Sequence, residues 1–261
     1  MRIFFYKYQG TGNDFIMIDD RDGSLNSLNK NQIEKLCSRK FGIGADGLIL
    51  LQNEKGFDFK MKYFNADGNE SSMCGNGGRC IAQFANDLGI VTGKTTFIAI
   101  DGPHDAEISR GIVKLKMTNV ADIKAIDDFF ILNTGSPHYV KIVDSTADVD
   151  VFFEGKKIRN SEPFKREGIN VNFVQNTDNS IKVRTYERGV ENETYSCGTG
   201  VVASALVKIH QNDTSDGEYE INVETIGGNL SVKAVRQGDS FNNIWLIGPA
   251  VFVYKGETLI I

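Results

Sequence analysis

Stretches in which every second residue is apolar run through most of this chain. In FDFKMKYF, residues 57–64, apolar side chains alternate with charged ones, which is the two-residue period of a half-buried strand. Comparable patterns predict strands in RIFFYKY, FIMID, LILL, TFIAI, IVKLKM, FFILN, IKVRTY, YEINVET, LSVKAV, IWLIG and VFVYK. Strands therefore dominate the predicted fold.

Helical spacing is less common along the chain. It predicts four helices, at Asn31–Lys40, Gly77–Leu88, Val149–Asn160 and Gly200–His210. Gly89 is expected to end the second of them, because glycine readily adopts the left-handed conformation that closes a helix.

Two of the predicted helices follow the same short motif. Residues 70–78 read ESSMCGNGG and residues 193–201 read ETYSCGTGV, so both contain Glu, then Ser or Thr, two variable residues and Cys-Gly-x-Gly. Each motif also follows an alternating strand and a polar loop, and the two lie nearly half the chain apart. We interpret this as a duplication. It predicts an α+β fold of two pseudo-symmetric lobes, each a mostly antiparallel β-sheet or barrel around a central helix.

The composition and net charge argue against some classes of protein. The 261 residues are 41% hydrophobic and carry a net charge of -5, which argues against a nucleic-acid surface. No segment approaches the roughly 18 consecutive apolar residues of a membrane span, and the first residues lack the apolar run of a signal peptide. We therefore expect a cytoplasmic protein with no membrane or nucleic-acid partner, whose thiols stay reduced.

The repeated cysteines, Cys74 and Cys197, are the strongest candidates for chemistry. Each is expected where a glycine-rich turn enters a helix, and the amide groups of a helix start favour both an anion and a thiolate. The glycines after each cysteine are expected to let the backbone bend tightly and approach a carboxylate. Two facing thiols could invert a carbon acid, one as base and one as acid. This chemistry is racemisation or epimerisation, without a cofactor.

The other two cysteines have a plainer interpretation. Cys37 shares a predicted helical face with Ile33 and Leu36, and Cys80 lies in the helix after Cys74, so both are expected to pack in the core. No C-x-x-C pair is present, which makes a structural zinc site a weak interpretation, and we expect no metal.

A competing motif occurs in FGIGADG, where Gly42, Gly44 and Gly47 have the spacing of a dinucleotide-binding loop. Such a loop follows a strand and opens a helix. Here it follows a predicted helix and precedes a predicted strand, so we reject it and expect tight-turn glycines.

At these motifs the sequence resembles the diaminopimelate epimerase family. GTGNDFIMID, FNADG, MCGNGGRC, TGSPH, GINVNFVQ, ERG and SCGTG occur in the family's order. The resemblance implies a homodimeric isomerase of lysine and peptidoglycan precursor biosynthesis that interconverts LL- and meso-diaminopimelate. It also implies that the last strand returns to the first lobe. The first lobe would span residues 1–117 plus 250–261 and carry Cys74, and the second would span residues 118–249 and carry Cys197.

The resemblance assigns roles around the reacting carbon. It implies that Cys74 and Cys197 are the two bases and that Glu187 receives the reacting amino group. Glu187 and its neighbour could also be an ordinary surface pair. Helix-start amides would hold the carboxylate on the reacting carbon at Gly75, Asn76, Gly198 and Thr199.

Other residues would recognise the far end of the substrate. The resemblance implies that Arg188 pairs with the distal carboxylate, as its planar fork allows, and that His138 tunes the thiols. Taken alone, His138 fits a structural histidine, and the asparagines beside Gly and Asp fit turns. Ser136 stands where many members have Asn, and Gly47 where some have Gln. The residues implied to read the distal amino-acid end are Asn13, Asn65 and Asn170.

Other functions stay open on the sequence. One is a related amino-acid racemase with the same fold. Another is a non-catalytic thiol-redox protein in which Cys74 and Cys197 form a regulatory disulfide. A third, an NAD-dependent enzyme, would have to bind a nucleotide.

Overall fold

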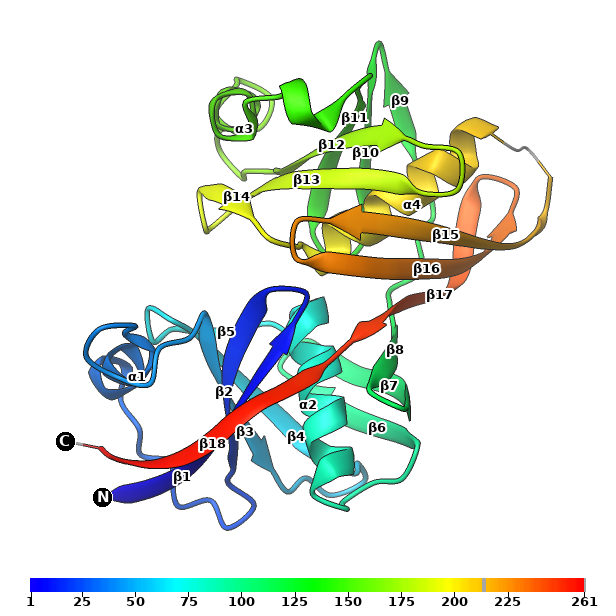
Figure 1. The fold of residues 1–261 in the computed structure, drawn as a ribbon. Coiled ribbons are helices and arrows are strands. Elements are labelled where there is room, and N and C mark those ends of the chain that lie inside the picture. Colours follow the sequence, from blue (N-terminus) through cyan, green and yellow to red (C-terminus); the bar gives the residue numbers. More distant parts are fainter. Residues whose placement is uncertain (213–214, 261) are drawn as a thin grey trace. The chain divides into compact units, whose positions relative to one another are not determined.

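The structure is a computed structural model that describes residues 1–212 and 215–260 (Figure 1). The chain divides into two compact units, one of Met1–Leu115 with the segment from Pro249 onward, the other of Lys116–Gly248. Both are rich in strands and contain few helices, so the predicted α+β class is confirmed. Residue 261, the last of the predicted first lobe, lies outside the described residues.

The first unit is built around the segment that follows Cys74. Its elements are β1 (Arg2–Gly10), β2 (Asn13–Asp19), α1 (Lys30–Cys37), β3 (Gly47–Gln52), β4 (Lys60–Asn65), β5 (Glu70–Ser71), α2 (Gly75–Asp87), β6 (Lys94–Ala99), β7 (Gly102–Ser109), β8 (Ile112–Lys116) and β18 (Val251–Leu259).

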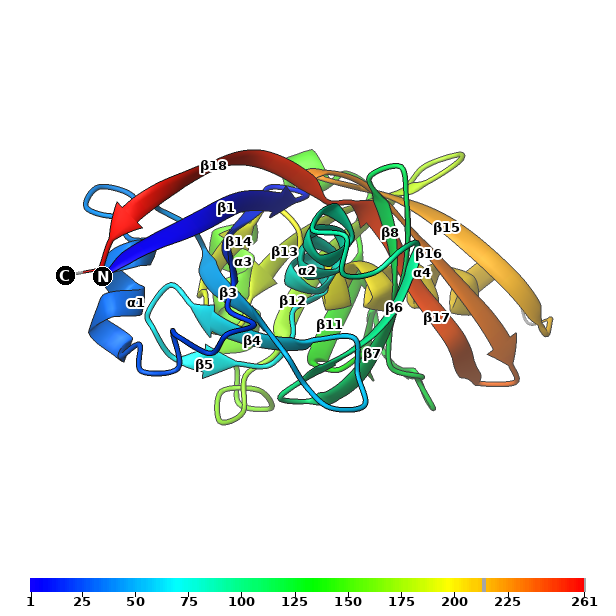
Figure 2. The same ribbon diagram turned by 90° about the horizontal axis from the view of Figure 1, so that it is seen from below.

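The helix α2 is the core of the first unit. It is buried continuously from Gly75 to Ala85 and contacts β1, β2, β3, β7 and β18 (Figure 2). A helix that is buried on every side belongs to a core rather than to a surface. It ends as predicted, because Leu88 caps it and Gly89 follows with a φ of 70°.

The second unit is built in the same way around the segment after Cys197. Its elements are β9 (Lys124–Ile126), β10 (Phe129–Asn133), β11 (Pro137–Ile142), the short 3-10 helix η1 (Thr146–Asp148), α3 (Val151–Arg159), β12 (Asn170–Asn176), β13 (Ile181–Glu187), β14 (Asn192–Thr194), α4 (Gly198–Asn212), β15 (Gly217–Thr225), β16 (Gly228–Gln237) and β17 (Ser240–Pro249). Helix α4 is buried along most of its length and contacts β10, β11, β12, β13, β15 and β16.

The two units repeat one order of elements and one pattern of pairing. Each has an antiparallel hairpin (β1–β2 or β10–β11), a surface helix (α1 or α3), and a strand parallel to the hairpin (β3 or β12). An antiparallel strand (β4 or β13), a short strand (β5 or β14) and the buried helix follow. A last group of strands begins parallel to β4 or β13. An extra strand, β18 or β9, pairs with the first strand of each hairpin.

The repeat extends to the pairing of individual residues near the cysteines. In the first unit Glu70 of β5 pairs with β4, and Cys74 follows four residues later. In the second unit Glu193 of β14 pairs with β13, and Cys197 again follows four residues later. The two cysteines therefore occupy the same position in two copies of one unit.

The same comparison relates positions on the strands. Phe15 of β2 lies opposite Gly47 of β3, whereas His138 of β11 lies opposite Asn170 of β12. Phe15 and His138 are thus equivalent positions. Counting from these registers, the other equivalent positions are Asn13 and Ser136, Gly47 and Asn170, and Asn65 and Glu187.

The structure differs from the sequence-based strands in several places. The strands that were not predicted are β5, β7, β9, β11, β12 and β14, and β4 begins only at Lys60. Proline and histidine near the start of β11, and alternating asparagines in β12, hide the usual apolar pattern of a strand. Asn170 and Asn172 are nevertheless buried, at 3% and 0% exposure, because their amides are hydrogen-bonded inside the unit.

The glycines of the FGIGADG segment and the two cysteines outside the repeated motif lie where the sequence predicted. The GIGADG segment connects α1 to β3, and Gly44 has a φ of 82°, so it is a turn and not a nucleotide loop. Cys37 and Cys80 are buried in α1 and α2. Burial raises the pKa of each of these two thiols to about 12, so both are protonated and pack as small apolar groups.

Candidate active site

Cys74 caps the buried helix of the first unit. Its backbone is extended (φ -99°, ψ 145°), and its Sγ accepts a hydrogen bond from the Gly77 amide at 3.2 Å. The sulfur thus takes the place that a serine or aspartate oxygen usually has at a helix start. Because the cysteine is the cap, α2 begins at Gly75, two residues earlier than predicted. The sulfur lies at the positive end of the helix dipole.

The glycines after the cysteines do not form the predicted tight turn. None of Gly75, Gly77, Gly198 and Gly200 has a positive φ, since all four lie inside helices. Gly77 and Gly200 instead leave space. A Cβ on Gly77 would lie 3.2 Å from Cys74 Sγ, and one on Gly200 would lie 2.3 Å from the Asn172 Oδ1. Close packing, not a tight turn, requires glycine there.

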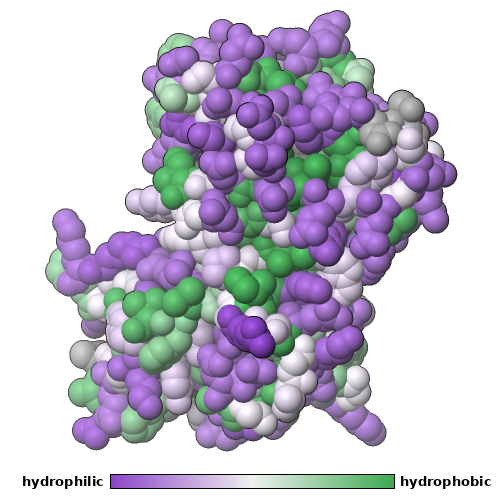
Figure 3. Space-filling model, turned by 45° about the vertical axis from the view of Figure 1, so that its right-hand side comes forward, coloured by the Kyte–Doolittle hydropathy of each residue, from purple (hydrophilic) through white to green (hydrophobic). Residues whose placement is uncertain are grey.

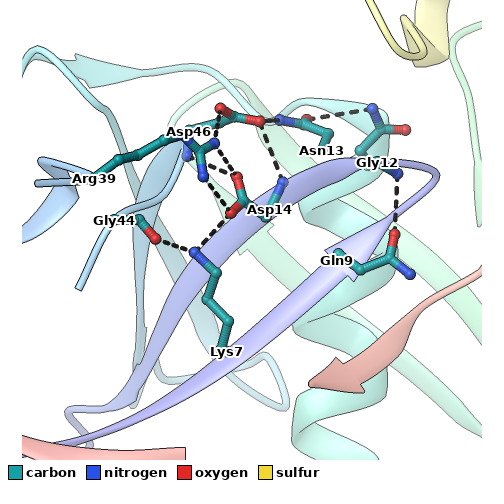
Figure 4. Close-up of polar contacts among 9 residues, drawn as sticks. Lys7, Gln9, Gly12, Asn13, Asp14, Arg39, Gly44 and Asp46 are labelled. Atoms are coloured by element: carbon teal, nitrogen blue, oxygen red, sulfur yellow. Dashed lines mark hydrogen bonds and ion pairs between the residues drawn. The ribbon is translucent and has the colours of Figure 1, made fainter. Parts of the chain in front are cut away.

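Asn13 lies beside the first cysteine. Its Oδ1 accepts a hydrogen bond from Asn76 Nδ2 at 3.3 Å and lies 3.9 Å from Cys74 Sγ. Its Nδ2 donates to Asp46 at 2.7 Å (Figure 4). Asn65 is the last residue of β4, and its side chain is exposed. The structure therefore brings Asn13, Cys74 and Asn76 together, with Asn65 at the end of the same sheet.

Arg79 supports this group from inside the unit, although the sequence analysis did not select it. It is fully buried and donates to the Gly75 carbonyl at 3.1 Å, to Asn76 Oδ1 at 3.0 Å and to Thr11 Oγ1 at 3.1 Å. Burial lowers the pKa of Arg79 to about 10, so it is still a cation at neutral pH. A charged residue between the glycines and the apolar positions of the helix is the signal that could have identified it. We define the N-terminal cluster as Asn13, Cys74, Gly75, Asn76 and Arg79.

Cys197 has the corresponding place in the second unit. It directly precedes α4, is buried, and its carbonyl accepts a hydrogen bond from the Val201 amide at 2.8 Å. Its Sγ lies 3.6 Å from Thr199 Oγ1. Thr134, itself fully buried, donates to the Thr199 carbonyl at 2.9 Å. The start of α4 is thus fixed to the loop after β10.

His138 is fully buried on β11 and is held by Asn172. The Asn172 amide nitrogen lies 3.1 Å from His138 Nδ1 and also donates to the Tyr139 carbonyl. An amide nitrogen can only donate, so Nδ1 accepts and Nε2 carries the proton of a neutral ring. Burial, together with the positive charge of Arg188, lowers the pKa of His138 to about 3. Its Nε2 is buried and has no hydrogen-bond partner among the described residues.

Asn172 is the second functional candidate that sequence reasoning missed. Besides its contacts with His138, its Oδ1 accepts from Thr185 Oγ1 at 2.9 Å and lies against Gly200. It connects the histidine strand to the start of α4. Its position two residues after Asn170, on the same strand face, was the available signal.

A second group of predicted residues meets at the beginning of β12. Asn170 donates from Nδ2 to Ser136 Oγ at 3.1 Å, and its Oδ1 accepts from the Arg188 amide at 2.9 Å. The Arg188 side chain donates to the Glu167 carbonyl at 3.0 Å and to Ser136 Oγ at 3.4 Å. Ser136 is therefore a hydroxyl bridge between an amide and a guanidinium.

Glu187 is the last residue of β13 and is half-buried. Its Oε2 accepts a hydrogen bond from Thr194 Oγ1 at 3.0 Å. The equivalent position in the first unit is Asn65, so both units place a polar side chain at this strand end. We define the C-terminal cluster as Ser136, His138, Asn170, Glu187, Arg188, Cys197, Gly198 and Thr199.

Two features are absent from residues 1–212 and 215–260. In these ranges no group of three or more His, Cys, Asp or Glu side chains is placed to hold a metal ion. Nor do the helices there include one with the length and apolar character needed to cross a membrane.

Known proteins are similar to this chain in sequence. The sequence model of the family described as diaminopimelate epimerase matches residues 5–121 and 130–253. A diaminopimelate epimerase of Flavobacterium psychrophilum is 52% identical over 96% of this chain and 98% of its own length. One of Aquifex aeolicus is 39% identical over 97% of this chain and 96% of its own length.

Solved structures with low sequence identity share the fold. A Bacillus anthracis phenazine biosynthesis protein of the PhzF family superposes with a TM-score of 0.76 at 15% identity, covering 100% of both chains. A probable proline racemase of Agrobacterium radiobacter superposes with a TM-score of 0.69 at 14% identity, covering 99% of this chain and 93% of its own. On the strength of the sequence matches, the chain belongs to the diaminopimelate epimerase family.

Proposed function

We propose that this protein interconverts LL- and meso-diaminopimelate with Cys74 and Cys197 as its two bases. The observation that carries the proposal is the equivalence of the cysteines, each directly before the buried helix of one repeat. Family membership, with a relative that is 52% identical over nearly the whole chain, supports this substrate over other amino acids.

In the proposed reaction one cysteine is a thiolate and the other a thiol. The thiolate removes the proton from the α-carbon, and the thiol delivers its own proton to the opposite face, which inverts the centre. The two sulfurs finish with exchanged protonation states. Negative charge that develops on the substrate carboxylate would be stabilised by the amide groups at the two helix starts, from Gly75 and Asn76 and from Gly198 and Thr199.

The C-terminal cluster supports recognition of the rest of the substrate. Glu187 is a carboxylate that could receive the reacting amino group, while Arg188 could bind the distal carboxylate. The neutral His138 has a buried N–H directed by Asn172, and we assign it a supporting role near the thiols. Asn13, Asn65, Ser136 and Asn170 supply the further polar groups of the proposed site.

The reaction is tested by turnover in deuterium oxide. Reduced protein, given LL-diaminopimelate without any added cofactor, should form the meso isomer with solvent deuterium on the inverted carbon. Cys197→Ala and Cys74→Ala should each lose inversion. Formation of unlabelled meso product, or near wild-type turnover by either variant, would rule out the two-base assignment.

A substrate panel separates this proposal from a related racemase. Structural relatives include a hydroxyproline epimerase with bound trans-4-hydroxy-L-proline. Turnover of proline or hydroxyproline in place of diaminopimelate would redirect the proposal to that substrate class while leaving the cysteine pair in place.

We also propose that the protein works as a homodimer in the cytoplasm, where its thiols stay reduced. Hydrophobic residues reach the surface in patches between hydrophilic ones (Figure 3). In the first unit, the paired strands expose Phe4 (63%) on β1 and the apolar run Val251, Phe252, Val253 (51%) and Tyr254 on β18. Exposed apolar surface on a strand pair is typical of an interface, and the partner proposed for it is a second copy of this chain.

A further inference from the structure

A line of hydrogen bonds, each donated in the same direction, runs beside Cys74. Arg79 Nη2 donates to Asn76 Oδ1 at 3.0 Å, and Asn76 Nδ2 donates to Asn13 Oδ1 at 3.3 Å. Asn13 Nδ2 then donates to Asp46 Oδ2 at 2.7 Å. The line begins at a cation that can only donate and ends at a carboxylate that can only accept.

These two ends determine how the amides between them are turned. A side-chain amide has nearly the same shape in its two flipped orientations but the opposite polarity. Asp46 accepts only from the nitrogen end of Asn13, and Arg79 donates only to the oxygen end of Asn76. The carbonyl oxygen of Asn13 is therefore the end that lies 3.9 Å from Cys74 Sγ.

Asp46 is itself held by a network of charges (Figure 4). Its Oδ1 accepts from Arg39 Nη2 at 2.7 Å, and the two terminal nitrogens of Arg39 also donate to both oxygens of Asp14, at 3.0 and 2.7 Å. The buried Lys7 lies 2.7 Å from Asp14 and donates to the Gly44 carbonyl. Burial alone would raise the pKa of Asp14, but hydrogen bonds from Arg39 and Lys7 lower it to about 2. Asp14 is therefore a carboxylate at neutral pH.

We propose that Asp46 is a positioning residue that keeps the carbonyl oxygen of Asn13, rather than its NH₂ group, against Cys74. An oxygen there accepts from the thiol S–H, whereas an NH₂ group would donate to the sulfur and favour the thiolate. Asp46 thereby helps to set how readily Cys74 gives up its proton. This inference deepens the proposed function, on which its catalytic consequence rests.

The variant that tests it is Asp46→Asn, which keeps the shape of the side chain but can donate as well as accept, so that only Asn76 still holds the Asn13 oxygen in its orientation. We expect kcat/KM for diaminopimelate to fall about tenfold, the equivalent of roughly one hydrogen bond. A second readout is independent of turnover: the rate at which iodoacetamide alkylates Cys74, followed by peptide mass spectrometry. We expect this rate to rise about fivefold, because thiolate is the reacting form.

Two controls separate positioning from general damage. Asp105→Asn makes the same chemical change at an exposed carboxylate that accepts from Thr96 in the same unit, and it should leave both readouts unchanged. In an Asn13→Ala background, Asp46→Asn should alter the Cys74 alkylation rate no further, since Asp46 acts through Asn13. An additive effect there, or an alkylation rate unchanged by Asp46→Asn alone, would overturn the inference. If the wild type does not turn over diaminopimelate, the proposed function fails, and the alkylation rates still decide the role of Asp46.

Discussion

His138 illustrates how burial changes the chemistry of a single residue. It is fully enclosed, accepts from Asn172 and is neutral, because burial lowers its pKa to about 3. A histidine with the ordinary pKa near 6.5 would titrate close to neutrality. This one cannot change its charge over the pH range in which an epimerase of this kind would work. Its proposed contribution is therefore that of a fixed N–H donor.

This neutral state makes stability depend on pH. Between the unfolded pKa near 6.5 and the folded pKa near 3, the unfolded chain binds the extra proton, so the free energy of unfolding falls as the pH is lowered. Between about pH 7.5 and pH 5 we expect wild type to lose about 2 kcal/mol more than His138→Gln does. Urea titrations of both proteins at the two pH values measure this difference. Equal losses in the two proteins would show that His138 takes up a proton within the fold.

At the scale of elements, the two buried helices depend on the absence of side chains near their starts. Gly77 approaches flexible groups, among them Ile49 Cδ1 and Met61 Cε, and a Cβ there would lie 3.2 Å from the nearest atoms. Gly200 approaches the Asn172 amide, which is held by three hydrogen bonds and cannot retreat. The equivalent glycines of the two repeats are therefore expected to differ in how well they tolerate an added side chain.

This contrast gives a graded prediction. Gly200→Ala should lower the free energy of unfolding by about 2 kcal/mol, because overpacking of the 2.3 Å contact outweighs the helix propensity of alanine. Gly77→Ala should cost less, about 1 kcal/mol or below, since its neighbours can shift. Denaturant unfolding of both variants measures the order. A larger loss for Gly77→Ala would contradict the role assigned to Asn172.

At the scale of the whole molecule, the proposed dimer can be tested by introducing a charged side chain into its interface. Phe4→Glu places a carboxylate on the apolar surface of β1 and β18 and should convert the dimer into a monomer in sedimentation equilibrium. Phe153→Glu is the matched control, because Phe153 on α3 is equally exposed, at 63%, and should leave the dimer intact. A monomeric wild type, or a Phe4→Glu variant that stays dimeric, would exclude this surface as the interface.

Much of the secondary structure, the internal repeat and the family can be predicted from the sequence. The alternating strands, the four helices and the repeated Cys-Gly-x-Gly motif depend on local periodicity and on residues that cap or end helices, which act over a few neighbours. Cys37 and Cys80 were correctly predicted to pack because a helical face is a local property. The family motifs likewise lie in continuous segments, so the sequence alone indicated the family.

Only the tertiary structure decided which distant side chains meet. Arg79 and Asn172 became candidates because burial forces their polar atoms to find partners on other elements, and no local pattern names those partners. The strand β12 was missed for the same reason, since its asparagines are satisfied by neighbouring strands. The Asn13 amide acquires its orientation from Asp46, 33 residues away in sequence. Spacing predicts where a residue lies on an element, whereas hydrogen bonds across elements determine which atom it presents.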